Sequence, residues 1–235
     1  MKHALIKLAI TIGFLLGLLT IPVKAADKGL AIGVLSNSST FDTSGTYTEG
    51  SCCNDQSITT HSNDVDFGSI FAEFTMRSDE GNGGWNIGIE YIPGDSSLGA
   101  KSRSETDTDA GGDNSATYTA KAEISDHYTV YVEPVFYPAS FLGVYLKGGV
   151  SRVTVNSLES LDNGIDSSAY GNSDVYGGMY GVGLRFETPI GVIFKTEYSK
   201  TQYGTVKMTS ESGNGGSISA DPEQESIRLG IGYQF

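Results

Sequence analysis

The closing stretch of the chain reads Ser226-Ile227-Arg228-Leu229-Gly230-Ile231-Gly232-Tyr233-Gln234-Phe235, and it decides the fold class. Alternate residues of an extended strand face opposite sides, so this stretch has one polar row and one apolar row. The apolar row consists of Ile227, Leu229, Ile231, Tyr233 and Phe235. In a soluble sandwich the apolar row would face a core, and such a strand would rarely close on its aromatic residue without a polar tail.

The first 25 residues have the layout of a secretory signal peptide. Lys2 and Lys7 precede an apolar run over 8–23, and small residues, Val23 and Ala25, precede the expected cleavage point. At about 16 residues, the run is shorter than the roughly 20 that a membrane-spanning helix needs. We expect cleavage after Ala25, export across the inner membrane, and a single barrel domain over 26–235.

The composition excludes a nucleic-acid partner and favours many strands. The formal charge is −13, and loss of the leader's three lysines makes it −16, whereas nucleic-acid binding needs clustered Lys and Arg. The 31 Gly, 13 Tyr and 6 Pro are typical of strands joined by polar loops. A hydrophobic content of 38% is low for a two-layer soluble core but suits a barrel with a polar interior.

Eight segments alternate between apolar and polar residues. They are 28–39, 65–77, 85–92, 115–137, 141–155, 175–187, 192–203 and 226–235. In the long fourth segment, the even positions from Tyr118 to Phe136 are mostly apolar, and we expect Pro134 to cause a bulge. A turn at Asp126-His127 would split this segment in two, but an odd strand count is unusual for bacterial single-chain barrels. We therefore interpret it as one strand that extends beyond the bilayer.

The lengths of the links alternate. Links after the second, fourth and sixth segments are short, at 78–84, 138–140 and 188–191. Links after the first, third, fifth and seventh are long, at 40–64, 93–114, 156–174 and 204–224. Outer-membrane barrels have this asymmetry between periplasmic turns and outer loops. The sequence thus predicts an all-β, eight-stranded antiparallel up-and-down transmembrane β-barrel with four long outer loops and three short periplasmic turns.

This pattern resembles the small eight-stranded outer-membrane barrels, namely the transmembrane domain of outer membrane protein A, outer membrane protein X and the opacity-type surface proteins. The resemblance covers the whole mature chain, and only the aromatic C-terminal strand is close to a motif. It implies location in the outer membrane of a Gram-negative bacterium, among lipid and lipopolysaccharide, and insertion as a monomer by the barrel-assembly machinery. It also implies that Ile231, Tyr233 and Phe235 belong to the signal that this machinery reads.

If the apolar rows face lipid, ten charged residues face the interior. They are Glu73, Arg77, Glu90, Glu133, Lys147, Arg185, Glu187, Lys195, Glu197 and Arg228. Five are acids and five are bases, and since isolated buried charges are costly, we expect them to pair. Glu90, Lys147, Glu197 and Arg228 should lie near mid-height of a roughly ten-residue crossing. Glu197 and Arg228 lie on adjacent segments, so we expect an ion pair between them.

Two interpretations of this interior remain open. Eight strands leave room only for side chains, so the charges are expected to form a polar plug that holds the barrel closed. The alternative is an ion-pair gate in a narrow porin-like channel; a wide diffusion pore is not expected. The main functional prediction is a non-enzymatic barrel with a structural role, or a surface-interaction role through acidic outer loops.

The outer loops contain a weak candidate for cation binding. Glu105, Asp107, Asp109 and Asp113 resemble the start of a calcium loop. However, Ala110 occupies the position of the required glycine, and Ala116 that of the bidentate glutamate. Solvation of an extended surface loop explains the same acidity.

Cys52 and Cys53 are adjacent in the first outer loop. Their Cα atoms should be about 3.8 Å apart, below the usual range for a disulfide. Free thiols, a strained redox-active pair and crosslinks to a partner all remain open. With His61 as the only nearby histidine, we expect no metal site and no cofactor.

A remote alternative is a lipid A-modifying enzyme. A deacylase needs serine, histidine and an acid together, but the mature chain has only His61 and His127, and His127-Tyr128-Thr129 lacks the expected serine. We therefore expect no enzymatic activity.

Overall fold

The computed structural model describes residues 28–48, 56–107, 114–160, 171–209 and 217–235. Within them the chain forms ten β-strands, and no described helix is long and apolar enough to span a membrane. The strands are β1 (Lys28–Thr48), β2 (Gln56–Arg77), β3 (Gly83–Ile92), β4 (Ser96–Asp107), β5 (Asn114–Ala139), β6 (Leu142–Ser160), β7 (Ser173–Glu187), β8 (Val192–Tyr203), β9 (Val206–Thr209) and β10 (Ser217–Gln234). The predicted signal peptide lies outside the described residues.

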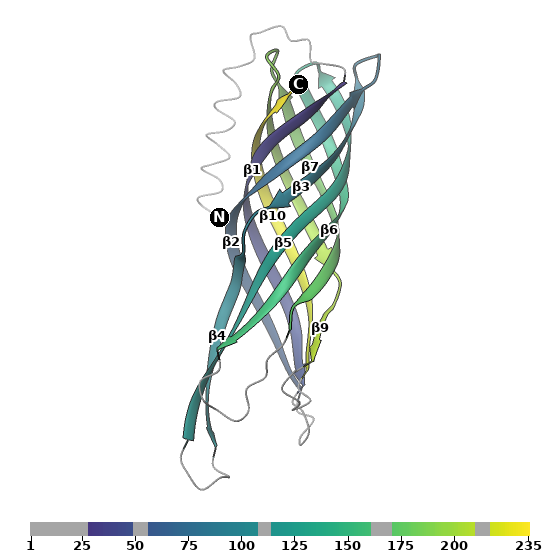
Figure 1. Ribbon diagram of the computed structural model, residues 1–235. Helices are drawn as coiled ribbons and strands as arrows, with labels where there is room; N and C mark the ends of the chain where they lie inside the picture. Colours follow the sequence, from purple (N-terminus) through teal and green to yellow (C-terminus); the bar gives the residue numbers. More distant parts are fainter. Residues whose placement is uncertain (1–27, 49–55, 108–113, 161–170, 210–216) are drawn as a thin grey trace.

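Eight strands close into an antiparallel barrel (Figure 1). Each pairs with the next in the order β1, β2, β3, β5, β6, β7, β8, β10, and β10 returns to pair with β1. β4 continues β3 and β9 continues β8; each pairs only with the strand that follows it, β5 or β10. The predicted eight-stranded barrel is therefore confirmed, including the single long strand over 115–137.

The predicted outer loops are largely strand, which corrects the sequence-based boundaries. β1 and β2 remain paired through Thr48 and Gln56, well beyond the predicted strand ends at 39 and 65. The link over 93–114 contains β4, and the link over 204–224 contains β9 and the start of β10. Backbone pairing does not require apolar alternation, so the Ser- and Thr-rich parts of these hairpins form ladders that the hydrophobic pattern misses.

β5 has a bulge at Asp126 and a second register shift between Phe136 and Ala139, but none at Pro134. Pairing with β6 shifts between Ser125 and Tyr128, whereas Val132 and Val135 pair in one register on either side of Pro134. Asp126 has a φ of 50°, as expected where one strand contains an extra residue. The predicted single apolar face of β5 is therefore wrong, because the bulge turns Ile124 inward while Tyr128 faces outward.

The outer face of the barrel changes from apolar to polar along the strands. Near the short turns, the outward residues form an apolar belt, with one example per strand being Val34, Phe74, Ile87, Val130, Leu146, Val182, Tyr198 and Ile231. These eight side chains are 45–63% exposed. Farther along β1 and β2 the outward positions become Ser36, Asp42, Asp64 and Asp66. The belt is the part that faces lipid, and the polar rows lie beyond it.

The inner face changes in the opposite sense. Inside the belt the lumen contains all ten charged side chains of the predicted set and many other polar ones, together with a few apolar residues such as Phe71 and Leu35. Beyond the belt it contains a compact apolar cluster, here called the outer core. Its buried members are Phe41, Ile124, Val153, Val175, Tyr203, Val206 and Met208. The structured part beyond the belt, here called the outer head, therefore has the polar exterior and apolar interior of a water-exposed domain.

Candidate functional site

All ten charged residues predicted to face the lumen are buried, with exposed fractions between 0 and 8%. They come from seven of the eight wall strands, since in the belt region β1 contributes uncharged residues to the interior. The inward positions are fixed by strand alternation, and the closed ladder brings positions from opposite sides of the barrel together. We call this set the ion column.

The column begins near the short turns. Arg77 lies 3.5 Å from Glu187, and its guanidinium carbon lies 3.5 Å from the centre of the Tyr137 ring. The Tyr137 hydroxyl donates a hydrogen bond of 3.0 Å to Glu187. Arg185 donates through Nε to the same carboxylate at 2.6 Å and also binds Glu73 through Nη1. Arg185 thus connects the carboxylate of Glu187 to that of Glu73.

Lys195 continues the column. Its ammonium lies 2.9 Å from Glu73 Oε2 and 2.8 Å from Glu133 Oε1. Asn86 donates to Glu133 at 3.0 Å, and the Tyr131 hydroxyl donates to Glu73 at 3.2 Å. Each carboxylate therefore accepts bonds from both a cation and a neutral donor, which offsets part of the cost of burial.

The four mid-height residues meet at the far end of the column. The Lys147 ammonium lies 3.1 Å from Glu197 and 3.5 Å from Glu90. Arg228 lies 2.8 Å from Glu90 and 3.4 Å from Glu197. The Arg228–Glu197 pair expected from the sequence is therefore present, and the two residues are direct register partners. Glu90 also accepts a hydrogen bond from Ser69 at 2.7 Å.

The ion column is continuous, because Lys147 also lies 3.7 Å from Glu133. Cations and carboxylates alternate from Arg77 to Arg228, and the formal charges cancel. A buried charge that loses its partner is strongly destabilised, so each member depends on its neighbours. The arrangement can hold the wall strands in one register, and it leaves all ten described charges with an opposite partner.

Two tyrosines fill the lumen beside the column, and glycines make space for them. A Cβ on Gly88 would lie 2.5 Å from the Tyr131 hydroxyl, and a Cβ on Gly183 would lie 2.5 Å from the Tyr145 hydroxyl. Tyr145 donates to Glu197 at 3.1 Å. The interior predicted from the sequence contains only charged residues and omits these tyrosines. Their inward alternation, opposite glycine on adjacent segments, was the available signal.

A neutral polar layer separates the ion column from the outer core. The Tyr203 hydroxyl lies 3.0 Å from Gln224 and 3.3 Å from His127, and Gln224 donates to Ser226 at 3.0 Å. Ser226 also bonds to Ser39 at 2.7 Å. His127 is therefore a buried hydrogen-bonded residue of the lumen, whereas His61 is exposed on β2.

Charged residues on the outer head form exposed pairs. Arg152 donates to Asp174 at 2.7 Å, and Thr154 donates to the same carboxylate at 2.7 Å. These hydrogen bonds, first that from Thr154, hold the pKa of Asp174 below its usual value. Hydrogen bonds to Glu223 and Glu225 raise the pKa of Lys200. Such exposed pairs are weak contributors to stability.

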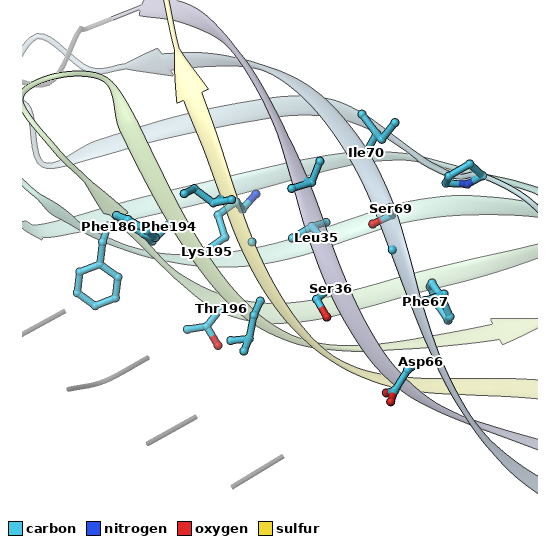
Figure 2. Close-up of a pocket in the computed structure, with 16 residues that line it drawn as sticks. Leu35, Ser36, Asp66, Phe67, Ser69, Ile70, Phe186, Phe194, Lys195 and Thr196 are labelled. Carbon is cyan, nitrogen blue, oxygen red and sulfur yellow. The ribbon is translucent and has the colours of Figure 1, made fainter. Parts of the chain in front are cut away.

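A groove of about 980 Å³ crosses the outer wall over β8, β10, β1 and β2 (Figure 2). Thr196, Leu229, Ser36 and Gly68 lie opposite one another across these strands, and three of these four lining residues are small. Asp66 lines it, and the ammonium of Lys195, which also lines it, binds carboxylates in the lumen. The groove lies largely on the lipid-facing side of the wall and has no arrangement of catalytic groups.

The other predicted sites are only partly described. Glu105 and Asp107 lie on β4, whereas Asp109 and Asp113 lie outside the described residues, as do Cys52 and Cys53. Among the described residues, no group of three or more His, Cys, Asp or Glu is placed to hold a metal ion. Ile231, Tyr233 and Phe235 are exposed on the outer face, with the rings of Tyr233 and Phe235 5.0 Å apart.

The sequence matches no protein-family model and no curated protein. Among solved structures, the outer membrane protein OprG from Pseudomonas aeruginosa is 13% identical, with 91% of this chain and 99% of that chain covered and a TM-score of 0.46. Ail, the attachment invasion locus protein of Yersinia pestis, in complex with the heparin analogue sucrose octasulfate, is 15% identical (86% and 99% covered, TM-score 0.39). The outer membrane protease OmpT from Escherichia coli is 9% identical (92% and 99% covered, TM-score 0.40).

With these identities and scores, the classification rests on the geometry of the chain itself. A closed wall of eight antiparallel strands, a continuous apolar belt on its outside and a charged interior give the protein the fold of the small eight-stranded outer-membrane β-barrels.

Proposed function

We propose that the protein is a non-enzymatic barrel that anchors a folded, acidic outer head at the bacterial surface, where the head contacts partners. The signal peptide over 1–25 would direct export, and Ile231, Tyr233 and Phe235 would be read by the barrel-assembly machinery during insertion as a monomer. Lipid and lipopolysaccharide would surround the apolar belt, and acyl chains would fill the groove on its outer face.

The observation that carries this proposal is the reversal of polarity beyond the belt. The outer head buries Phe41, Val153, Val175 and Met208 while exposing acids such as Asp42 and Asp64. Strands that only lined a pore would not need an apolar interior outside the membrane. A folded head presents a defined surface, which supports a role in surface interaction.

The same observation argues against the narrow channel. An ion moving through the lumen would need to pass the paired charges of the ion column and then the outer core, whose largely apolar side chains could not replace its hydration shell. The ion column alone is compatible with a gate, but the apolar cluster above it favours a closed plug. We therefore assign the column a structural role.

Planar-bilayer recordings test this assignment. We expect the wild-type protein to give no steady conductance, because two successive barriers close the lumen. Glu197→Ala and Arg228→Ala are expected to lower stability without producing a steady current, since the outer core remains. A steady wild-type current that Glu197→Ala or Arg228→Ala alters would support the ion-pair gate instead.

Enzymatic activity on lipid A remains the remote alternative. His127 is buried in the lumen, and its hydrogen-bond partner is Tyr203, so it lacks access to a lipid substrate at the outer wall. Incubation of the protein in lipopolysaccharide-containing vesicles, followed by mass spectrometry of lipid A, is expected to show no change in acylation.

A further inference from the structure

Two long strand edges of the outer head have no backbone partner among the described residues, that of β2 over 56–69 and that of β4 beyond Ser97. β4 pairs with β5 from Ser96–Ile124 to Asp107–Asn114, and no described strand pairs with its other side. The described contact on that side includes a hydrogen bond from Asn63 to the Ser97 carbonyl at 3.4 Å, at the base of β4. Figure 1 shows β4 and the start of β5 extending as a ribbon away from the short turns.

This side of β4 has no described partner strand because the chain diverges between β3 and β4. The β2–β3 ladder ends at the pair of Ile70 and Tyr91. Pro93, which lacks an N–H, and Gly94, which has a φ of 84°, then interrupt the strand before β4 begins. An open strand edge is a template for pairing with another strand.

The charges of β4 follow a self-complementary order. Lys101 and Arg103 are followed at alternate positions by Glu105 and Asp107, with Ser104 at the centre. Their direct register partners on β5 are all uncharged, namely Ala120, Tyr118, Ala116 and Asn114. The hairpin itself thus places no opposite charge across the ladder from any of the four.

We propose that β4 pairs with β4 of a second copy of this chain. In an antiparallel pair centred on Ser104, Lys101 lies opposite Asp107 and Arg103 lies opposite Glu105, and symmetry repeats both contacts. Shifting the centre by one residue to Arg103 places two arginines opposite each other, and a shift to Glu105 places two glutamates opposite each other. Opposite charges across a ladder stabilise a pair and like charges destabilise it, so one register is selected.

The geometry assigns the two copies to facing membranes. Copies in one membrane are related by an axis along the membrane normal, and such an axis leaves strands that project from the surface parallel. Parallel, in-register pairing would put like charges side by side. Antiparallel pairing requires the two barrels to point toward each other, so β4 would link one cell surface to another. The proposal rests on the proposed function, because it needs the barrel to hold β4 outside the membrane.

Vesicle clustering tests the pairing. Full-length mature protein is reconstituted in phosphatidylcholine vesicles, and clustering is followed by light scattering. A basic variant carries Glu105→Lys and Asp107→Lys, and an acidic variant carries Lys101→Glu and Arg103→Glu. We expect wild-type vesicles to cluster and each variant alone to cluster at least ten-fold more slowly. A mixture of the two variants should recover wild-type clustering, because every opposed position then carries opposite charges.

Two controls isolate the role of β4. Exchange of the exposed outer-head pair, Arg152→Asp with Asp174→Arg, keeps the charge constant and should leave clustering unchanged. Raising the salt to 0.5 M should disperse wild-type vesicles, since exposed ion pairs are screened. Each variant is first shown to fold by its heat-modifiable migration on gels.

The proposal is wrong if wild-type vesicles stay dispersed or if the mixture clusters no faster than its components. A folded barrel that neither clusters nor conducts would remove the pairing and leave the proposed function intact. A steady current in planar bilayers would instead contradict the proposed function, whatever the vesicles do.

Discussion

At the scale of single residues, Lys195 shows how strongly the interior depends on charge pairing. Its ammonium is buried and lies within 3 Å of carboxylate oxygens of both Glu73 and Glu133. A carboxylate left without a cation in such a site loses both its hydration and its Coulomb partner. The residue therefore matters for the stability of the wall.

Lys195→Met is expected to lower the free energy of unfolding by about 3–5 kcal/mol, because it leaves two acids facing each other in the lumen. Urea unfolding in lipid vesicles, followed by tryptophan fluorescence of Trp85, measures the change. Adding Glu133→Gln to Lys195→Met should restore part of the loss. The control Lys207→Met, at an exposed position of β9, should change stability by no more than about 0.5 kcal/mol. Equal effects at both lysines would contradict this account.

At the scale of elements, the bulge at Asp126 lets β5 stay paired with β6 on both sides of an extra residue. Ser125 pairs with Thr154 and Tyr128 pairs with Arg152, so Asp126 and His127 together face the single residue Val153. Without Asp126, both strands would have the same number of residues in this interval. Ile124 and His127 would then both point inward by simple alternation.

Deletion of Asp126 is therefore expected to be tolerated. The ladder between β5 and β6 should become continuous, and removal of a positive φ relieves a strain of roughly 1–2 kcal/mol at most. Deletion of Val132 is the matched control. It should prevent folding, because it turns inward residues such as Tyr131 and Thr129 toward lipid. Heat-modifiable migration and urea unfolding report both outcomes, and loss of folding on deletion of Asp126 would show that the bulge itself is required.

At the scale of the whole molecule, the reversal of polarity separates a membrane-spanning part from a water-exposed part within the same strands. Outward side chains are apolar in the belt and polar on the outer head, while inward side chains change from charged to apolar. Both changes lower the free-energy cost of solvation, because apolar side chains face lipid in the belt and polar side chains face water on the outer head. The boundary between the apolar belt and the outer head should therefore be detectable. A charge introduced on the belt side should lower the free energy of unfolding more than a charge introduced on the outer-head side.

Leu146→Arg, at a position of the belt that is 63% exposed, should destabilise the barrel by roughly 2–4 kcal/mol in vesicles. Gln202→Arg, at an exposed outward position beyond the belt, should cost less than about 1 kcal/mol, because the arginine stays in water and near Glu223. Equal costs at the two positions would show that the boundary is misplaced.

Much of the fold could be predicted because strand alternation acts locally. The wall strands, the short turns and the inward position of Glu197 and Arg228 follow from period two and link length. The outer extensions were missed, because serine- and threonine-rich hairpins pair through the backbone without an apolar pattern. The predicted face of Ile124 was wrong, because a bulge depends on the residue count of the neighbouring strand, which the sequence of β5 does not contain.

The sequence by itself determined the strand number, the orientation of the apolar rows and the set of charges that face the interior, because each depends on alternation along one strand. Only the tertiary structure decided which charges meet across the lumen, since Lys195 and Glu73 come from strands far apart in the chain. It also decided that β4 keeps a free edge among the described strands and that an apolar core lies above the ion column. These features arise only when the sheet closes, because closure brings the inward faces of distant strands to within a side chain's length of each other.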